Sequence, residues 1–323
     1  MPTVAIAVAG PTASGKTALS LPLADRFGGE IVCCDSMQIY RGMDIGTAKA
    51  TAWEQARVPH HLLDVVSPTD VYSAADYAVD ALRAAEDIAA RGKMPIFVGG
   101  TGLYLEAART GRHEESIQSD PSFRAEMATL AETEGAERVY RLLREKDPES
   151  AAAIHPNNVR RVIRALEIFH VTGLTKSELD RKTKLLPPKL DLCLLYLTFE
   201  DRELLYRRIR LRVEEMFHEG LEEEVRSLLE KGMLPAGSTA AQAIGYKEIL
   251  SFLRGECSER EAMDAVTLAT RRYAKRQITW FSAQSYAHPI QMDRGGEMRP
   301  AEEVLEEASV VVQNFLNVNS SLQ

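Results

Sequence analysis

The sequence lacks the cysteine patterns of a metal site or a disulfide framework. It has only four cysteines, and no two of them form a C-x-x-C pair: Cys33, Cys34, Cys193 and Cys257. Structural zinc sites and redox motifs depend on such spacing. Cys33 and Cys34 are neighbours in a predicted strand, so their side chains point to opposite faces. We therefore expect packed, reduced thiols, as in the cytoplasm.

Long apolar runs and an excess of positive charge are missing as well. No segment approaches the ~18 apolar residues of a membrane helix, and no basic stretch precedes the short apolar run at the N-terminus. With 39 Lys and Arg against 47 Asp and Glu, the formal net charge is −8. This argues against nucleic-acid binding through bulk charge but leaves room for local basic patches. We expect a soluble cytoplasmic protein that acts without a membrane.

What the sequence does contain is a complete phosphate-binding motif, G-x-x-x-x-G-K-[ST]. Its members are Gly10, Pro11, Thr12, Ala13, Ser14, Gly15, Lys16 and Thr17. The apolar run Val4–Ala9 precedes it and the helix-forming stretch Ala18–Phe27 follows it, which is the context that the motif requires. Inward-pointing N–H groups and the start of that helix can surround the phosphate chain of ATP or of a diphosphate. We expect Lys16 to reach the terminal phosphate and the Thr17 hydroxyl to bind Mg²⁺.

The first hundred residues alternate between β-rich and helical stretches. Strands are expected at residues 4–9, 30–34 and 95–98, and helices at 18–27 and 73–91. This alternation predicts an α/β fold with a parallel sheet flanked by helices, and the phosphate motif makes the sheet P-loop NTPase-like. A fourth strand is expected at Leu192–Thr198 and a weaker fifth near Ser309–Val312.

A long helical region, residues 119–184, separates the third strand from the fourth. It is too long for a simple crossover, so we interpret it as an inserted helical subdomain. Residues 1–118 and 185–285 then form the core domain. The second of these segments begins with a proline-containing linker that returns the chain to the core. Residues 286–323 are a C-terminal extension, whose polar end from residue 314 is expected to fray.

Two strand ends carry the residues that decide the chemistry. In open parallel sheets, ligands bind outside the carboxyl ends of the strands. Asp35 follows the second strand, and Gly99-Gly100-Thr101-Gly102 follows the third. An ordinary ATPase or kinase has a Mg²⁺-binding Asp at such a strand end, which the third strand lacks. Asp35 is therefore a candidate general base, with metal binding as the alternative, and the Thr101 hydroxyl can stabilise a leaving oxygen.

Beyond these features, the sequence resembles the bacterial tRNA dimethylallyltransferases. The resemblance is collinear from residue 3 to residue 282 and rests on seven blocks: GPTASGKT, DSMQIYRGMDIGTAK (35–49), PHHLLD (59–64), VGGTGLYL (98–105), RRVIRALEI (160–168), AIGYKE (243–248) and TRRYAKRQITWF (270–281). One departure is Ser282, where the family often has Arg, and it weakens any nucleic-acid contact assigned there. The chain also lacks the zinc-finger extension of eukaryotic relatives.

The resemblance implies a prenyl transfer. A dimethylallyl group would pass from dimethylallyl diphosphate to N6 of adenosine 37 in the anticodon loop of certain tRNAs. Asp35 would take the proton of the amine, a poor nucleophile. Lys16, the Thr101 hydroxyl and Mg²⁺ at Thr17 would take up the charge of the departing diphosphate. Arg212 resembles the family arginine that approaches the diphosphate.

The resemblance also places the segment Ser36-Met37-Gln38 against the target adenine, next to Asp35 and Thr101. Gln38 can donate and accept, as an adenine edge requires; an ordinary turn role is the alternative. We expect the partners to be dimethylallyl diphosphate and the anticodon stem-loop of tRNA, with no protein partner and a monomeric chain.

Basic side chains of the inserted region are predicted to bind the tRNA backbone. Arg160, Arg161 and Arg164 lie within one family block, and the first and last have helical i, i+4 spacing. Phosphate contacts would explain such a cluster in an acidic chain. The alternative is a solvated helix surface, or pairing with acids such as Glu167.

Two other classes of function compete with prenyl transfer. An ATP-dependent small-molecule kinase would use the same phosphate loop but needs an acid at the end of the third strand and a lid with arginines. A nucleotide-dependent RNA-binding switch would not require Asp35 and Thr101 beside the phosphates. Transfer of label from dimethylallyl diphosphate to tRNA separates the three.

Overall fold

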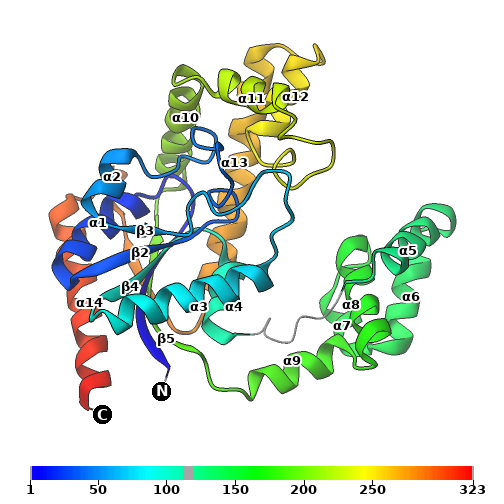
Figure 1. Ribbon diagram of the computed structural model, residues 1–323, viewed down its shortest axis with the longest axis horizontal. Helices are drawn as coiled ribbons and strands as arrows, with labels where there is room; N and C mark the ends of the chain where they lie inside the picture. Colours follow the sequence, from blue (N-terminus) through cyan, green and yellow to red (C-terminus); the bar gives the residue numbers. More distant parts are fainter. Residues whose placement is uncertain (1, 112–118, 322–323) are drawn as a thin grey trace. The chain divides into compact units, whose positions relative to one another are not determined.

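A computed structural model describes residues 2–111 and 119–321 (Figure 1). Its compact packing divides the chain into two units: Met1–Arg109 with Lys189–Gln323, and Thr110–Pro188. The end predicted for the first core segment, residue 118, lies outside the described residues. The inserted unit corresponds to the helical region expected between the third and fourth strands. The C-terminal segment is part of the first unit.

The core of the first unit is a parallel sheet with the strand order β3-β2-β4-β1-β5-β6. The strands are β1 (Thr3–Ala9), β2 (Gly29–Cys34), β3 (His60–His61), β4 (Met94–Gly99), β5 (Leu190–Thr198) and β6 (Ala287–Gln291). The first, second, fourth and fifth match the four main strands expected from the sequence. A separate two-stranded antiparallel pair, β7 (Asp293–Arg294) with β8 (Glu297–Met298), follows β6.

Helices cover both faces of this sheet, because the central strands are apolar on both sides. On one face, α3 (Ala74–Ala90) and α4 (Gly102–Thr110) pack on side chains such as Val32 and Phe97. On the other face, α1 (Lys16–Phe27) and α14 (Ala301–Ser321) pack on Ile6 and Val8. The predicted P-loop NTPase-like α/β fold is confirmed. Three of the cysteines, Cys33, Cys34 and Cys193, are buried in it.

The strand expected near Ser309–Val312 is wrong. These residues lie in the middle of α14, and the helix continues to Ser321, through most of the segment that was expected to fray. Its valine-rich sequence resembles a strand, but Val304, Ala308 and Val312 follow one another at intervals of four and form the buried stripe of a helix. The fifth long strand is instead β6, which carries Pro289 and gives little strand signal. It pairs only with β5, and an edge strand tolerates proline.

The rest of the first unit consists of helices and the loops that connect them. It contains α2 (Ala52–Arg57), α10 (Arg202–His218), α11 (Leu221–Glu230), α12 (Tyr246–Leu253) and α13 (Glu259–Ser282). Helices α11 and α12 form a small core with Ile39, Tyr40 and Met43 of the loop after β2. This packing fixes the position of a loop that follows directly on Asp35.

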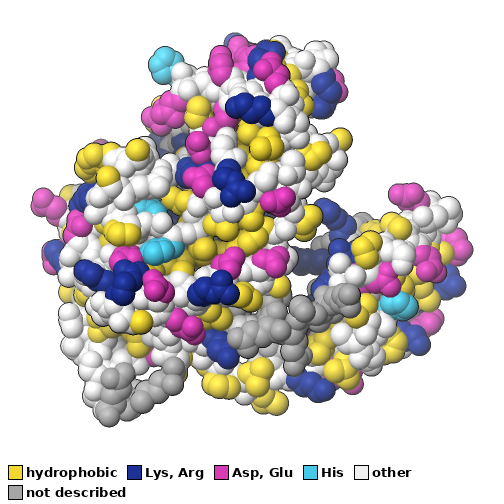
Figure 2. Space-filling view, in the orientation of Figure 1, with side chains coloured by type: hydrophobic (Ala, Val, Ile, Leu, Met, Phe, Trp, Pro, Cys, Tyr) yellow, Lys and Arg dark blue, Asp and Glu magenta, His cyan; other side chains and the backbone are white. Residues whose placement is uncertain are grey.

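The second unit contains five helices among its described residues: α5 (Pro121–Glu134), α6 (Ala136–Lys146), α7 (Pro148–Ala153), α8 (Val159–Thr172) and α9 (Lys176–Lys184). Val139, Leu143 and Val162 are central to its own apolar core. None of the described helices in either unit has the length and apolarity to cross a bilayer. Figure 2 shows acidic and basic side chains interspersed on the visible face.

Candidate active site

The register of the sheet brings three predicted loops to one edge. Ala9 of β1 and Cys34 of β2 both pair with Gly99 of β4. The next residue on each strand therefore lies at the same carboxyl edge. The phosphate loop, Asp35 and the Gly100-Thr101 turn come together there, although they are separated in the sequence.

The phosphate loop has the backbone of an anion site. Gly15 precedes α1 with φ 97°, a left-handed conformation that favours glycine, and no side chain caps this helix start. Its N–H groups are therefore available to an anion. The Ser14 hydroxyl is buried and has no hydrogen-bond partner among the described residues. A phosphate oxygen would supply the partner that a buried polar group requires.

Lys16 folds back over this loop. Its Nζ donates hydrogen bonds to the carbonyl oxygens of Gly10 at 3.2 Å and Pro11 at 2.9 Å. Burial, and then the charge of Arg212, lower the pKa of Lys16 to about 8, and the charge of Asp35 opposes this shift. The ammonium group has no carboxylate partner among the described residues, so an anionic ligand would stabilise its charged form.

Two arginines of α10 border the loop. Arg208 Nε donates to the carbonyl oxygen of Ala13 at 2.9 Å. Arg212 Nε is buried without a hydrogen-bond partner in the described part of the chain. Burial also lowers the pKa of Arg212, while the Asp35 charge raises it. The charge of Arg212, a predicted site residue, therefore affects Lys16 and is itself affected by the charge of Asp35. Arg208 was missed as a loop contact, since a helix full of arginines does not reveal which of them faces inward.

Asp35 and Thr101 are linked through Ser36. The Ser36 N–H donates to Thr101 Oγ1 at 3.1 Å, and the Thr101 hydroxyl is 3.4 Å from Ser36 Oγ. One carboxylate oxygen of Asp35 accepts the Met37 N–H at 2.9 Å. Tyr273 lies beside them: burial first, and then the Asp35 charge, raises the pKa of its hydroxyl to about 12. The hydroxyl therefore stays protonated near neutral pH. This tyrosine was not predicted as a site residue.

Gln38 is occupied by internal contacts in this structure. Its amide nitrogen donates to the carbonyl oxygens of Thr47 and Ala48 at 3.0 and 3.2 Å. Its amide oxygen accepts the Cys33 thiol at 3.2 Å. These contacts correspond to a structural role in the loop after β2, and the predicted adenine contact stays a prediction.

The three arginines predicted to bind RNA all lie on α8, in the second unit, and they differ in their surroundings. Arg164 forms an ion pair with Glu167 at 2.5 Å, and Glu167, which is fully buried, also binds Arg124. Arg160 and Arg161 are exposed, and no ion pair holds either of them within the described residues. Arg164 thus has the internal partner that was the alternative interpretation, whereas the other two remain available to a ligand.

Comparison with known proteins assigns the family. A model of the IPP transferase family matches residues 38–284 of this chain. The chain belongs to this family. It is 49% identical over 281 residues to the tRNA dimethylallyltransferase of Geobacillus thermodenitrificans, covering 86% of this chain and 87% of that protein. It is 46% identical over 282 residues to that of Caldanaerobacter subterraneus, covering 87% and 89%.

Solved structures of the IPP transferase family have the same fold. The tRNA isopentenylpyrophosphate transferase of Bacillus halodurans is 39% identical, with a TM-score of 0.73, and the similarity covers 100% of this chain and 99% of that one. A eukaryotic dimethylallyltransferase acting on tRNA is 29% identical, with a TM-score of 0.82 over 98% of this chain and 80% of that one. The predicted family resemblance is therefore confirmed.

One residue that joins the phosphate loop to the turn after β4 was missed in the sequence. The buried Gln277 of α13 accepts the Thr12 N–H at 2.9 Å and donates to the Gly100 carbonyl oxygen at 2.9 Å. A Cβ on Gly100 would lie 2.0 Å from the Gln277 amide nitrogen, so only glycine permits this approach. The signal was in the block TRRYAKRQITWF, but α13 is long and nothing in its sequence indicates that this side chain points to residues 177 and 265 positions away.

Replacing Gln277 with Glu is expected to disturb both loops together. A carboxylate can still accept the Thr12 N–H, but it places a second acceptor against the Gly100 carbonyl oxygen in a buried position. Displacements of this kind cost up to about 10²-fold in rate. Steady-state transfer kinetics and thermal melting measure the effect, with Gln284→Glu as a matched control, because Gln284 donates to one carbonyl of the same helix. Equal activity of the two variants would contradict the prediction.

The side chains at the phosphate loop fit a Mg²⁺ ion that is bound mainly by the phosphates of the protein's ligand. No cluster of three or more His, Cys, Asp or Glu side chains able to hold a metal occurs among the described residues. Mg²⁺ prefers oxygen ligands and is commonly bound by one or two protein groups together with phosphates and water. The Thr17 hydroxyl at the first turn of α1 is such a group.

Proposed function

We propose that this prenyltransferase moves a dimethylallyl group from dimethylallyl diphosphate to N6 of adenosine 37 in the anticodon loop of tRNAs. The observation that carries the proposal is the meeting of Asp35 with an anion-binding loop at one edge of the sheet, while β4 ends in glycines and Thr101 instead of an acid. A carboxylate beside a diphosphate site suits proton removal from a nucleophile. The names of the family members given above support the choice of tRNA as acceptor.

In the proposed reaction, a bond forms between N6 of adenine and the allylic carbon as the bond from that carbon to the diphosphate oxygen breaks. The diphosphate leaves with the electron pair, and the proton lost from N6 passes to the Asp35 carboxylate. Lys16, Arg212 and the N–H groups at the start of α1 stabilise the charge on the leaving group. The burial of Lys16 beside Arg212 and the uncapped start of α1 support these roles. Mg²⁺, held by Thr17 and the diphosphate oxygens, would supply further neutralisation.

Incubation of the protein with radiolabelled dimethylallyl diphosphate and unmodified tRNA tests this function. Label should move to the tRNA, and digestion should recover it on N6 of adenosine 37. A parallel reaction with γ-labelled ATP tests the kinase alternative. Label that stays on the diphosphate donor, in a protein that is folded and binds tRNA, would contradict the proposal.

We also propose that Arg160 and Arg161 contact the tRNA backbone. Replacing both with Gln should weaken tRNA binding and reduce the slope of log affinity against log salt by about 0.7 to 0.9 for each phosphate that the variant no longer binds. Arg138→Gln is a control, because Arg138 already pairs with Glu134 at 3.3 Å. An unchanged slope, measured by binding titrations at several salt concentrations, would remove the two residues from the RNA-binding surface.

Arg164 should behave differently from its two neighbours. Its removal leaves the buried Glu167 carboxylate with one ion-pair partner fewer, and broken buried pairs are costly. We therefore expect Arg164→Gln to lower the melting temperature while its salt slope stays near that of the wild type. This contrast separates a structural arginine from the two that are free to meet phosphates.

A further inference from the structure

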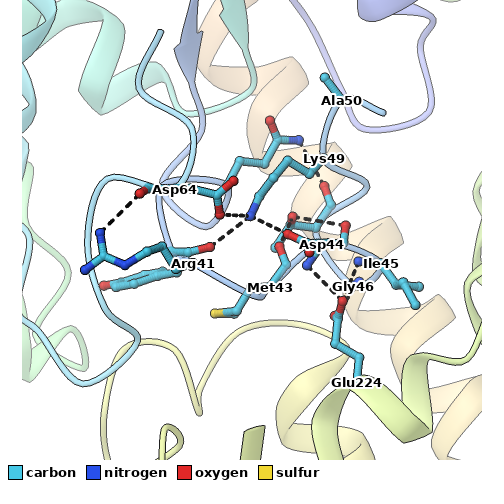
Figure 3. A network of polar contacts seen from close by, with 12 residues as sticks. Arg41, Met43, Asp44, Ile45, Gly46, Lys49, Ala50, Asp64 and Glu224 are labelled. Atoms are coloured by element: carbon cyan, nitrogen blue, oxygen red, sulfur yellow. Dashed lines mark hydrogen bonds and ion pairs between the residues drawn. The ribbon is translucent and has the colours of Figure 1, made fainter. Parts of the chain in front are cut away.

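Lys49 lies at the centre of a polar network in the loop that follows β2 (Figure 3). Only 4% of its side chain is exposed. Its ammonium group donates to the Tyr40 carbonyl oxygen at 2.9 Å, to Asp44 at 2.6 Å and to Asp64 at 2.6 Å. The three N–H donors of the lysine thus have one acceptor each: Tyr40 and Asp44 in the loop after β2, and Asp64 in the stretch after β3. The side chain holds these parts together.

Glu224 of α11 fixes the same loop from its other side. One carboxylate oxygen accepts the N–H groups of Asp44 and Ile45 at 2.9 and 2.7 Å, and the other accepts that of Gly46 at 3.1 Å. The Tyr246 hydroxyl donates to the second oxygen at 2.6 Å. Three successive N–H groups converging on one carboxylate define the course of residues 44–46, and Figure 3 shows Glu224 reaching them.

The backbone around Lys49 is strained. Four non-glycine residues have positive φ in the described chain, and three of them belong to this region: Ala48 at 45°, Leu62 at 62° and Asp64 at 55°. Such conformations are unfavourable for non-glycine residues and persist only where surrounding contacts impose them. The Lys49 and Glu224 contacts are the ones that hold this loop in place.

The strained loop bears directly on the segment that follows Asp35. The Thr47 and Ala48 carbonyl oxygens orient the Gln38 amide. On the opposite side, Val66 N–H donates to the Ile39 carbonyl oxygen at 3.1 Å. The segment from Asp35 to Ile39 is therefore held between the two stretches that Lys49 joins. No hydrogen bond or ion pair connects the described residues 41–49 with the phosphate loop.

We propose that Lys49 and Glu224 are positioning residues that set the geometry of Asp35 and its following segment for the tRNA half of the reaction. This inference rests on the proposed function. The hydrogen bonds of both side chains go to the loop after β2, to Asp64 and to Tyr246, and none goes to the described phosphate loop. Their effect is therefore on the placement of the base and of the nucleotide that it serves. Misplacement by about 1 Å can cost about 10²-fold in rate.

Lys49→Met tests the proposal because it keeps the apolar stem and removes the three hydrogen bonds. We expect kcat/KM for tRNA to fall about 10²-fold, with the KM for dimethylallyl diphosphate within about twofold of the wild type. The assay measures label transfer below the melting temperature of each variant. Lys93→Met is the matched control, since Lys93 is exposed near the opposite end of β4.

Asp64→Asn keeps the test decisive if Lys49→Met does not fold. Asn tolerates the positive φ of this position and can still accept one hydrogen bond, but it lacks the charge. The Asp64→Asn variant should therefore show a smaller decrease in kcat/KM for tRNA than Lys49→Met. Glu224→Gln should also decrease kcat/KM for tRNA. Its amide nitrogen cannot accept the hydrogen bonds from backbone N–H groups that a carboxylate oxygen of Glu224 accepts.

The outcomes are distinguishable from those that test the function itself. If the wild type and Lys93→Met transfer no label, the proposed function fails. If they transfer label and the Lys49, Asp64 and Glu224 variants lower only the melting temperature, or raise the KM for both substrates equally, the positioning role is overturned.

Discussion

Replacing Asp35 with Asn is expected to slow dimethylallyl transfer by about 10²-fold or more, the usual cost of removing a general base. The substitution is conservative in shape, because an Asn oxygen can still accept the Met37 N–H that Asp35 now accepts at 2.9 Å. The turn after β2 should therefore persist, and the loss would be chemical. Single-turnover transfer with saturating tRNA and donor measures the chemical step.

Two measurements decide whether Asp35 acts as the base. Affinities for tRNA and for dimethylallyl diphosphate should stay near those of the wild type, and the rate deficit should shrink as pH rises and solvent hydroxide replaces the carboxylate. Asp25→Asn is the control, since Asp25 pairs with Arg57 away from the site. A near-normal single-turnover rate for Asp35→Asn would show that the carboxylate is not the general base. Metal binding would then be the first alternative role to test.

Replacing Lys16 with Met is expected to raise the KM for dimethylallyl diphosphate and to lower kcat, with a combined loss of about 10² to 10³-fold. Loss of one charge-stabilising donor at a developing oxyanion has effects of this size. The ammonium now rests on the Gly10 and Pro11 carbonyl oxygens, contacts that a diphosphate would replace or share. Arg cannot substitute for it freely, because a planar fork differs from a compact cation.

The comparison that matters for Lys16 is between the two substrates. Isothermal titration with inorganic diphosphate should show weaker binding by the variant, while tRNA affinity in the absence of donor stays unchanged. Lys93→Met again serves as the control for removal of a lysine charge. A variant that loses tRNA affinity and keeps its diphosphate affinity would show that the loop has been assigned to the wrong substrate.

Local sequence determined the parts of this protein that depend on a few consecutive residues. The motif from Gly10 to Thr17 requires a strand, a tight loop and a helix in immediate succession, and the structure has all three. Alternation of apolar strands with helices was enough for the parallel sheet. Position after a strand was enough to place Asp35 and Thr101 at its carboxyl edge, because parallel strands end on the same side.

Long-range packing decided what local sequence could not. Whether residues 309–312 form a strand or a helix depends on the sheet face that Val304, Ala308 and Val312 cover. Side chains of β1, β2, β4, β5 and β6 build that face. Gln277 and Arg208 each join residues more than 170 positions apart in the chain. The attachment of Lys49 to Asp64 depends on how two neighbouring loops fold against each other. A side chain's type sets which hydrogen bonds it can make, and only the folded backbone decides which partners come within reach.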